Sequence, residues 1–464
     1  MACGSDAEAR VGGAFQPVFG HAGLRSDGER ERQDPRLAAY RVLSDVDRGE
    51  FADRAAGRRL RGLPAADRAL ALELAYGSIR LRGRLDAELS RLLDQPLERL
   101  DPRVLGWLRL GLYQLRETRV PDHAAVDQTI SGIRTTVGAG LTGLANAVLR
   151  RAAREGRRQD AYPDADHDPE GYLVSWGSHP AWLVRRWLAR WPLASVRRLV
   201  ENDNKPPPVT LRVLDASLDH EADLVPEDGV RLAAESDWKG MFRLAEGTPE
   251  QALRSLPCVV QDPAAAAVVD YVGDEVAGPA VDACAAPGGK TIGLAWRHRE
   301  ARPFVAADVS GARLKLLRES LDRLRLDVGL VRMDSRVPAI RRARTVLLDA
   351  PCTGSGVLRR RPDARWRIDQ GRLHSLVGLQ EELLEASATV LESGGLLVYA
   401  TCSLEPEENE EQVESFLARH PEFRREPPDP GWVAEGTTDE NGDLRVWPWV
   451  WDTDGAFASR LRRL

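Results

Sequence analysis

Apolar residues recur at three- and four-residue spacing from about residue 34 to residue 157. One such stripe consists of Leu70, Leu74, Tyr76, Ile79, Leu85, Leu89 and Leu92. This spacing is that of an amphipathic helix. Pro35 and Pro102 stand where two helices are expected to begin, a position at which the missing N–H costs nothing. The pattern predicts an all-helical domain over residues 34–157.

From residue 266 onward, short apolar runs alternate with helical patterns. The runs are AVDACAAPGG, PFVAADVS, VGLVRMDS, RTVLLDAPC and GGLLVYATC, and each ends in polar or reactive residues. Segments such as GARLKLLRESLDRLR, with helical period, lie between them. This alternation predicts a parallel sheet with helices on both faces, a Rossmann-like α/β domain over residues 266–464.

The remaining segments complete a multidomain arrangement. Residues 1–33 show no period and are expected to be a disordered arm. Residues 158–178 are polar and are predicted to be a linker. Residues 179–265 begin with a helical pattern, PAWLVRRWLARW, and continue with a strand-like one, PPPVTLRVL, which predicts a small α+β connecting module.

Composition narrows the class of protein. The 464 residues are 43% hydrophobic and carry a net charge of -6, which excludes a wholly disordered chain and a uniformly basic nucleic-acid coat. The charge is uneven, because residues 35–157 sum to +7 and residues 400–457 to -11. The basic part therefore coincides with the predicted helical domain, where nucleic acid would dock.

Cysteine usage and hydropathy suggest where the protein works. The five cysteines are scattered and form no CxxC pair: Cys3, Cys258, Cys284, Cys352 and Cys402. This argues against a disulfide framework or a metal site and fits a reducing, cytoplasmic location. No apolar stretch approaches the ~18 residues of a membrane span. Nothing in the sequence demands more than a monomer.

The first candidate motif is VDACAAPGGKT, residues 281–291. A strand ends at Asp282, and a glycine pair opens the next helix, so backbone N–H groups could approach a ligand closely. The spacing is neither a dinucleotide fingerprint nor a P-loop, and a tight turn would explain a lone glycine pair. Asp308 ends the next strand 20 residues after Gly288, where an acidic residue typically binds ribose hydroxyls. Asp334 ends the third strand and could line an adenine pocket, although each aspartate could instead cap a helix.

Two further motifs end the next strands. LLDAPCTGSGVLRRRPDARW carries Asp349 and Cys352, and LLVYATCSLEPEENEEQV carries Cys402. Two thiols at adjacent strand ends, beside a carboxylate, suggest covalent catalysis and require a lowered pKa for at least one thiol. A disulfide or two small buried side chains are the alternatives. The acidic run after Cys402 is expected to be only a helix start. Three consecutive arginines could hold a phosphate backbone or form a solvated surface: Arg359, Arg360 and Arg361.

At these motifs the sequence resembles the bacterial small-subunit rRNA cytosine-5 methyltransferases of the RsmB (Sun/Fmu) type, within the NOL1/NOP2/Sun group. The resemblance extends over about residues 34–464. VPDHAAVDQTI and LANAVLRR resemble the NusB-like RNA-binding domain of that family, HPAWLVRRW and NDNKPPPVTLRV its connecting module, and WDTDGAFASRLRR its last hairpin.

The resemblance implies a cofactor and a role for each site residue. S-adenosylmethionine would be held at its methionine end by the loop Cys284, Ala285, Ala286, Pro287, Gly288, Gly289 and Lys290. Asp308 would bind the ribose and Asp334 the adenine. Asp349 would face both the cofactor and the cytosine, Cys402 would be the nucleophile, and Cys352 would assist release of the enzyme from the product. The implied substrate is small-subunit (16S) rRNA, with no metal and no membrane.

Three rival functions follow from the same residues. The same chemistry could act on tRNA. A non-catalytic RNA-binding or antitermination-like factor could keep the fold as a scaffold, but the intact set of Cys352, Cys402, Asp349 and Lys290 counts against it. A methyltransferase acting on DNA or a small molecule would not need two cysteines and a basic helical domain.

Overall fold

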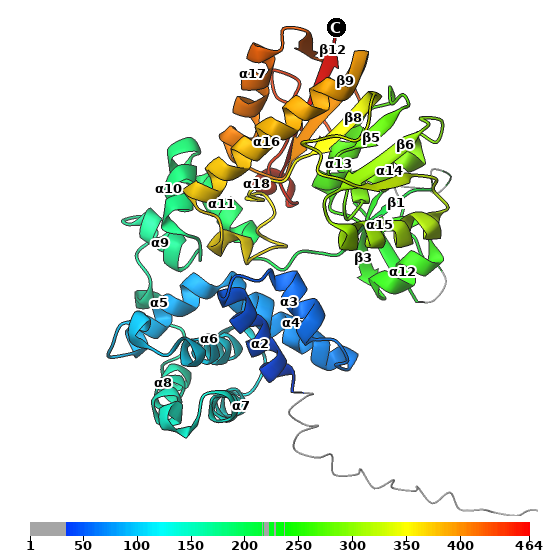
Figure 1. Cartoon of the computed structure of the whole chain (residues 1–464). Coiled ribbons are helices and arrows are strands. Elements are labelled where there is room, and N and C mark those ends of the chain that lie inside the picture. Colours follow the sequence, from blue (N-terminus) through cyan, green and yellow to red (C-terminus); the bar gives the residue numbers. More distant parts are fainter. Residues whose placement is uncertain (1–33, 216, 218–221, 227–228, 236) are drawn as a thin grey trace, which may run out of the picture.

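The computed structural model describes residues 34–215, 217, 222–226, 229–235 and 237–464. The predicted arm, residues 1–33, lies outside the described residues. Three parts follow one another along the chain: a helical domain, a small module and a large α/β domain (Figure 1). The multidomain fold class predicted from the sequence is confirmed.

The first part is helical, as its apolar period predicts. Its helices are α2 (Pro35–Asp47), α3 (Ala52–Arg59), α4 (Ala65–Arg80), α5 (Arg82–Leu92), α6 (Pro102–Glu117), α7 (Asp122–Thr136) and α8 (Thr142–Glu155), with short 3-10 turns at Leu97–Arg99 and Ala139–Leu141. Pro35 and Pro102 are the first residues of α2 and α6, as expected. The core is apolar, and in it Tyr40 stacks on Trp107 with ring centroids 4.5 Å apart.

The second part of the chain forms two groups: three helices that pack on residues of the large domain, and an antiparallel sheet with a core of its own (Figure 1). Its elements are a 3-10 turn (Gln159–Ala161), α9 (Pro169–Ser175), α10 (Ala181–Arg190), α11 (Leu193–Asp203), β1 (Thr210–Val213), β2 (Arg231–Ala234), β3 (Met241–Glu246), α12 (Pro249–Ser255) and β4 (Cys258–Val260). The strand order is β2-β3-β1-β4. The segment expected as a linker contains α9, because Asp168 caps the helix, Pro169 begins it and Leu173 is buried on it.

The third part is a mixed sheet covered on both faces. Its strands are β5 (Ala280–Asp282), β6 (Phe304–Asp308), β7 (Gly329–Arg332), β8 (Ala343–Asp349), β9 (Leu391–Thr401), β10 (Phe423–Arg425), β11 (Leu444–Val446) and β12 (Ala456–Arg463). Its helices are α13 (Pro263–Val272), α14 (Gly289–Arg297), α15 (Gly311–Leu324), α16 (Gln370–Val390), α17 (Glu410–Arg419) and α18 (Pro448–Trp451), with 3-10 turns at Ala364–Trp366 and Pro406–Glu408. All five strands predicted from the apolar runs are present.

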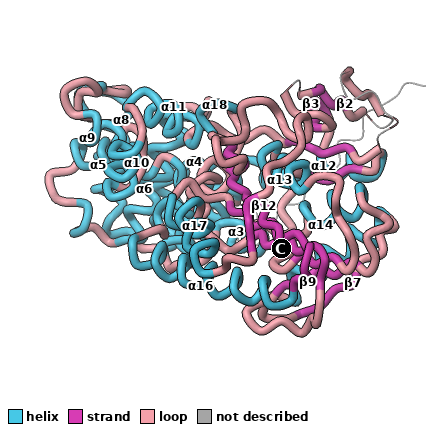
Figure 2. The backbone as a smooth tube through the Cα atoms, turned by 90° about the horizontal axis from the view of Figure 1, so that it is seen from above, coloured by secondary structure: helices cyan, strands magenta, loops and turns pink. Residues whose placement is uncertain are grey.

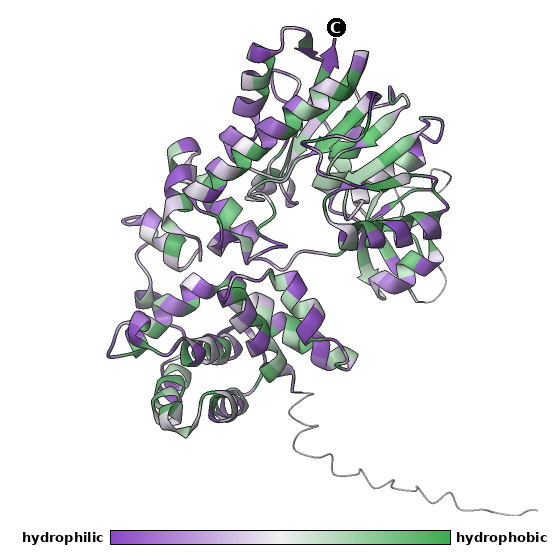
Figure 3. Ribbon diagram, in the orientation of Figure 1, coloured by the Kyte–Doolittle hydropathy of each residue, from purple (hydrophilic) through white to green (hydrophobic). Residues whose placement is uncertain are grey.

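The strand order of this sheet decides where a site can form. The order is β10-β12-β9-β8-β5-β6-β7, with β7, β6, β5, β8 and β9 mutually parallel and β12 antiparallel to β9. One face packs on α13, α14 and α15 and the other on α16 and α17. The strands run through the middle of this part in Figure 2, and Figure 3 shows them as predominantly hydrophobic. Ligands of such sheets bind beyond the carboxyl ends of the parallel strands.

A short stretch after Cys352 joins the three parts. We call residues 358–367 the docking segment. The Arg365 guanidinium is fully buried and donates hydrogen bonds to five acceptors: the carbonyl oxygens of Arg80, Ser178, Asp203 and Leu358 and Oδ1 of Asn204. Trp366 Nε1 donates to the Ile79 carbonyl at 2.8 Å. The helical domain and the module therefore both bind the chain that follows a candidate catalytic cysteine.

In the part of the chain that the structure describes, none of the helices is long and apolar enough to cross a membrane.

Candidate active site

The predicted site residues meet at one edge of the large sheet. Asp282 ends β5, Asp308 ends β6 and Asp349 ends β8, while Cys402 directly follows β9. The pairing register places Asp282 beside Leu347 of β8 and beside Ala306 of β6. Residues predicted from motifs that are far apart in the sequence are therefore brought to adjacent strand ends.

The loop between β5 and α14 is held in a tight shape. Gly288 has a φ of 109°, in the left-handed region, and a Cβ at this position would lie 2.1 Å from Cδ1 of Leu317. Only glycine fits both the backbone angle and the space. The buried Asp308 carboxylate accepts hydrogen bonds from the amides of Ala286 at 3.1 Å and Ser310 at 2.8 Å. Asp308 therefore orders the loop through Ala286 and holds a carboxylate at the edge where a ribose would bind.

Asp282 lies beneath this loop and is fully buried. Burial raises the pKa of its carboxyl to about 7, against a hydrogen bond that Thr291 Oγ1 donates to it at 2.6 Å. Asp349 and Asp308 raise this pKa further by charge repulsion, whereas Lys290 lowers it. A carboxyl in this environment takes up a proton near neutral pH.

Lys290, in the first turn of α14, forms an ion pair with Asp349. The Nζ–Oδ2 distance is 2.7 Å, and the side chains are 16% and 31% exposed. Burial lowers the pKa of the lysine, but the charge and the hydrogen bond of Asp349 more than offset it, so the pKa is raised overall. Lys290 is thus a fixed positive charge that aims a carboxylate at the site.

Cys352 and Cys402 lie together, with their Sγ atoms 3.4 Å apart and both thiols free. A hydrogen bond from Cys352 lowers the pKa of Cys402, and the positive charges of Lys290 and Arg361 lower it further, against burial and the charge of Asp349. The same hydrogen bond, burial and the charges of Cys402 and Glu408 raise the pKa of Cys352. Lys290 and Arg361 lower the pKa of Cys402 and Glu408 raises that of Cys352, so the directions of the two shifts favour Cys402 as the thiolate of the pair and Cys352 as its hydrogen-bond donor.

A buried glutamate supports the loop that carries Cys352. Glu408 is fully buried and accepts hydrogen bonds from the Thr353 amide at 2.8 Å and from Gln380 Nε2 at 2.9 Å. Glu405 is also buried and pairs with Arg186. The expectation that this acidic run is only a helix start is therefore wrong for these two residues. The spacing of acidic residues in this run is that of a solvated helix. Only the fold shows that the carboxylates of Glu405 and Glu408 are buried.

The three consecutive arginines have different surroundings. Arg359 is buried and donates to Asn202 Oδ1 at 3.1 Å and to the Asp452 carbonyl at 2.9 Å. Arg360 bridges Asp262 at 2.6 Å and Asp454 at 2.8 Å. Contact of these two with RNA stays a prediction, but their guanidinium groups already have partners within the protein, with Arg359 buried and Arg360 27% exposed. Arg361 is exposed and stays a candidate.

Asp334 follows the end of β7 and is exposed, as an adenine contact would have to be. Its carboxylate pairs with Arg336 at 2.6 Å, and this hydrogen bond lowers its pKa. Cys284 is half-buried in the cofactor loop, where burial raises the pKa of its thiol well above the usual range. It is therefore an unreactive side chain that lines the loop.

One residue that the sequence analysis did not single out borders the loop. The Gln261 side chain is buried, and neither Nε2 nor Oε1 of its carboxamide has a hydrogen-bond partner in the described part of the chain. Its Nε2 lies 3.3 Å from the position that a Cβ of Gly289 would occupy. No periodicity marks this residue, because it stands in a short turn between β4 and α13.

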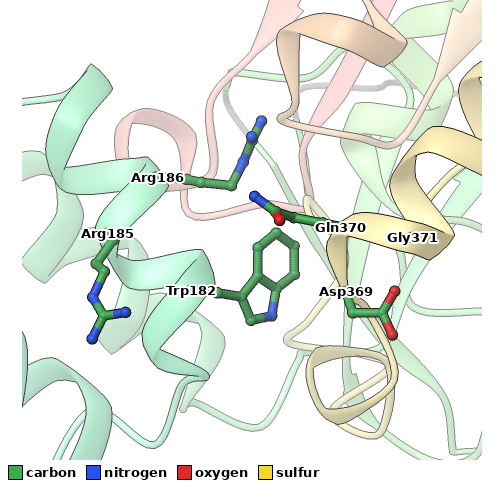
Figure 4. A pocket seen from close by; sticks show the side chains of 6 residues that line it. All are labelled: Trp182, Arg185, Arg186, Asp369, Gln370 and Gly371. Carbon is green, nitrogen blue, oxygen red and sulfur yellow. The ribbon is translucent and has the colours of Figure 1, made fainter.

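A separate hollow lies away from this edge. It has a volume of about 600 Å³ and is lined by Trp182, Arg185, Arg186, Asp369, Gln370 and Gly371. Trp182 projects from α10 toward the beginning of α16 (Figure 4). None of the predicted site residues lines it. Among the described residues there is no group of three or more His, Cys, Asp or Glu side chains that could hold a metal ion.

Family models match three parts of the chain. The model described as 16S rRNA methyltransferase RsmB/F matches residues 271–462, the NusB family model matches residues 33–154, and a ferredoxin-like domain model of the RsmF/B type matches residues 179–240. The three matches follow the order of the parts in the fold.

Relatives with curated names match over most of the chain. The ribosomal RNA small subunit methyltransferase B of Pseudomonas putida is 36% identical over 410 residues, covering 84% of this chain and 90% of the relative. That of Vibrio vulnificus is 34% identical over 449 residues, covering 92% of this chain and 98% of the relative.

Two solved structures are similar in fold. The crystal structure of PH0851 gives a TM-score of 0.71 at 23% identity, with coverage of 92% of this chain and 99% of its own. A methyltransferase homolog protein from Pyrococcus horikoshii gives a TM-score of 0.51 at 28% identity, with coverage of 65% and 100%.

Proposed function

The chain belongs to the 16S rRNA methyltransferase RsmB/F family, and from this premise we propose that it methylates C5 of a cytosine in small-subunit rRNA. The methyl donor is S-adenosylmethionine, and the reaction passes through a covalent adduct between the base and Cys402. The observation that carries the proposal is the free pair of thiols, 3.4 Å apart, at the sheet edge that also holds the Lys290–Asp349 ion pair.

The residues at this edge fit the cofactor. Gly288 provides no side-chain cap for α14, so the first N–H groups of this helix have no partner within it, and the positive end of the helix dipole there favours a carboxylate. Asp308 offers a carboxylate for ribose hydroxyls and Asp334 one for the adenine. Bound S-adenosylmethionine would supply a methyl group on a positively charged sulfur.

The thiol pair answers the difficulty of the reaction. C5 of cytosine is a poor nucleophile, and addition of the Cys402 thiolate to C6 converts the ring into an enamine that is nucleophilic at C5. The lowered pKa of Cys402 keeps this sulfur in its reactive form. Asp349, held by Lys290, would accept a hydrogen bond from N3–H once the ring nitrogen has taken up a proton from solvent, and would thereby stabilise the charge that develops in the ring.

Cys352 completes the cycle. Its pKa is raised partly by the neighbouring Cys402 thiolate, and that charge disappears when the Cys402 sulfur bonds to C6. The Cys352 thiol then releases its own proton to solvent more readily, and the resulting thiolate can take the proton from C5. As that proton leaves, the bond between C6 and the Cys402 sulfur breaks, the ring regains its double bond, and Cys402 returns as a thiolate.

The substrate must present an unstacked base. A cytosine inside a helix cannot expose C6 to a thiol at the sheet edge, so the target lies in looped or single-stranded RNA. The helical domain, with its net charge of +7 over residues 35–157, supplies the electrostatic docking surface. The four described cysteines are free, as a reducing cytoplasmic location requires.

Methyl transfer from labelled S-adenosylmethionine to protein-free small-subunit rRNA, with tRNA in parallel and nucleoside analysis afterwards, tests the proposal. We expect 5-methylcytidine in the rRNA alone. 5-Methylcytidine in tRNA alone would keep the chemistry and replace the substrate. Cofactor binding without any 5-methylcytidine in naked or ribosome-assembling rRNA would favour the non-catalytic alternative.

A further inference from the structure

We propose that Gln261 is a cofactor-binding residue that recognises the α-amino acid end of S-adenosylmethionine. The inference rests on the proposed function and adds one contact to the same site. Its carboxamide would donate from Nε2 to the carboxylate of the methionine part and accept at Oε1 from the ammonium group.

The first support is that the amide is buried and unpartnered at both ends. Gln261 is 7% exposed, and neither Nε2 nor Oε1 has a hydrogen-bond partner among the residues that the structure describes. A buried amide that makes no hydrogen bond destabilises the fold. A protein keeps such a group where a ligand completes it, and here the ligand must offer both an acceptor and a donor.

The second support is the position of the side chain. Nε2 of Gln261 lies 3.3 Å from where a Cβ of Gly289 would be, so the absence of a side chain at Gly289 makes room for the amide. Gly289 is the first residue of α14, and the first N–H groups of any α-helix have no partner within the helix. The carboxamide therefore lies beside the first residue of α14, and the two together would suit a carboxylate next to an ammonium group.

The third support is that hydrogen bonds hold the backbone of Gln261 and the next residue, Asp262. The backbone N–H of Gln261 donates to the Thr210 carbonyl at 3.1 Å, and Thr210 Oγ1 donates to the backbone carbonyl of Gln261 at 2.7 Å. Asp262 caps α13 by accepting from the Ala264 amide at 2.9 Å, and it also pairs with Arg360. The backbone that carries the Gln261 side chain is therefore fixed before the ligand arrives, which lowers the entropic cost of binding.

The same contacts favour the cofactor over the target base. Gly289 belongs to the loop of the cofactor motif, whereas the loop that carries Cys352 reaches this region through Arg360 and Asp262. The Gln261 amide therefore lies against the cofactor loop, and Asp262 is the residue of this turn that binds the other loop.

Binding of two ligands to Gln261→Met tests the inference. Methionine keeps the length of the side chain and removes both polar atoms. We expect the Kd for S-adenosylmethionine to rise about ten-fold, the effect of losing hydrogen bonds worth about 1.4 kcal/mol. The Kd for 5′-methylthioadenosine, which lacks the amino acid end, should change less than about two-fold. Gln261→Asn, which retracts the amide, should lie between.

Unfolding of the ligand-free variants separates this role from a structural one. Gln261→Met should be at least as stable as the wild type, because two unpartnered buried atoms are removed. The matched control is Gln412→Met on α17, a buried glutamine whose Nε2 donates to the Val377 carbonyl. We expect the control to lose stability and to keep its affinity for S-adenosylmethionine.

Three outcomes would overturn the inference. One is an unchanged Kd for S-adenosylmethionine in Gln261→Met, and another is an equal loss for both ligands. A loss of RNA affinity with unchanged cofactor affinity would assign the amide to the RNA instead.

A wild type that binds neither ligand would overturn the proposed function as well. Normal wild-type binding with an unaffected variant would overturn this inference alone.

Discussion

Two regions of the large domain use a positively charged side chain in opposite ways. At the sheet edge, Lys290 is paired with one partly exposed carboxylate and faces the site. In the docking segment, Arg365 is fully buried and occupied by five acceptors that include backbone atoms of all three parts. A positive side chain can serve chemistry where it pairs with a partly exposed carboxylate, as Lys290 does. It serves assembly of the fold where it is fully buried and hydrogen-bonded, as Arg365 is.

Removal of the nucleophile should have the largest effect, and it acts at the sheet edge alone. Cys402→Ala is expected to lower methyl transfer at least about 10³-fold, because the sulfur that adds to C6 of the cytosine is lost. Its Kd for S-adenosylmethionine should stay within about two-fold of the wild-type value. Turnover assays and cofactor titration of the same preparation measure both, and near-normal turnover would remove Cys402 as the nucleophile.

The docking segment should respond in stability instead. Arg365→Met leaves five acceptors without their donor, and we expect it to lower the free energy of unfolding by about 3 kcal/mol or more. The matched variant Arg361→Met changes an exposed arginine four residues away and should stay within about 0.5 kcal/mol. Urea unfolding of both variants makes the comparison. Equal stability of the two would contradict the assembly role of Arg365.

RNA affinity should separate Arg361 from Arg359 and Arg360. Loss of one phosphate contact in Arg361→Met should reduce the slope of log affinity against log salt by roughly 0.7–0.9. Arg359→Met and Arg360→Met should not change this slope, because their guanidinium groups bind the protein itself. Filter binding over a salt series measures the three slopes. A change confined to the Arg359 or Arg360 variant would assign the phosphate contact to that residue instead of Arg361.

The smallest effect concerns pH. The lowered pKa of Cys402 keeps its thiolate, and therefore activity, to lower pH than an unperturbed cysteine would, and activity is lost as pH falls through that pKa. Arg361 contributes to the lowering, so Arg361→Met should move the acidic limb of kcat/KM toward higher pH. High salt should weaken this difference between variant and wild type. A limb that does not move would remove Arg361 from the electrostatics of the site.

How far the sequence predicts this molecule depends on the distance over which a signal acts. The strands, the helix starts at Pro35 and Pro102 and the strand-end positions of Asp308 and Asp349 follow from local period and turn chemistry. The fate of Arg359 does not, because its partner Asn202 lies 157 residues away in the sequence. Gln261 was missed for the same reason, since only the fold shows that its amide is buried against the cofactor loop.

The division of labour between the two cysteines is tested most directly with Cys352→Ala. The variant is incubated with small-subunit rRNA and S-adenosylmethionine, and any covalent protein–RNA complex is isolated under denaturing conditions and mapped by peptide mass spectrometry. We expect the complex to accumulate, with the cytosine bonded through C6 to Cys402. Product release at the wild-type rate with no complex, or a cytosine bonded elsewhere than Cys402, would contradict the proposed mechanism.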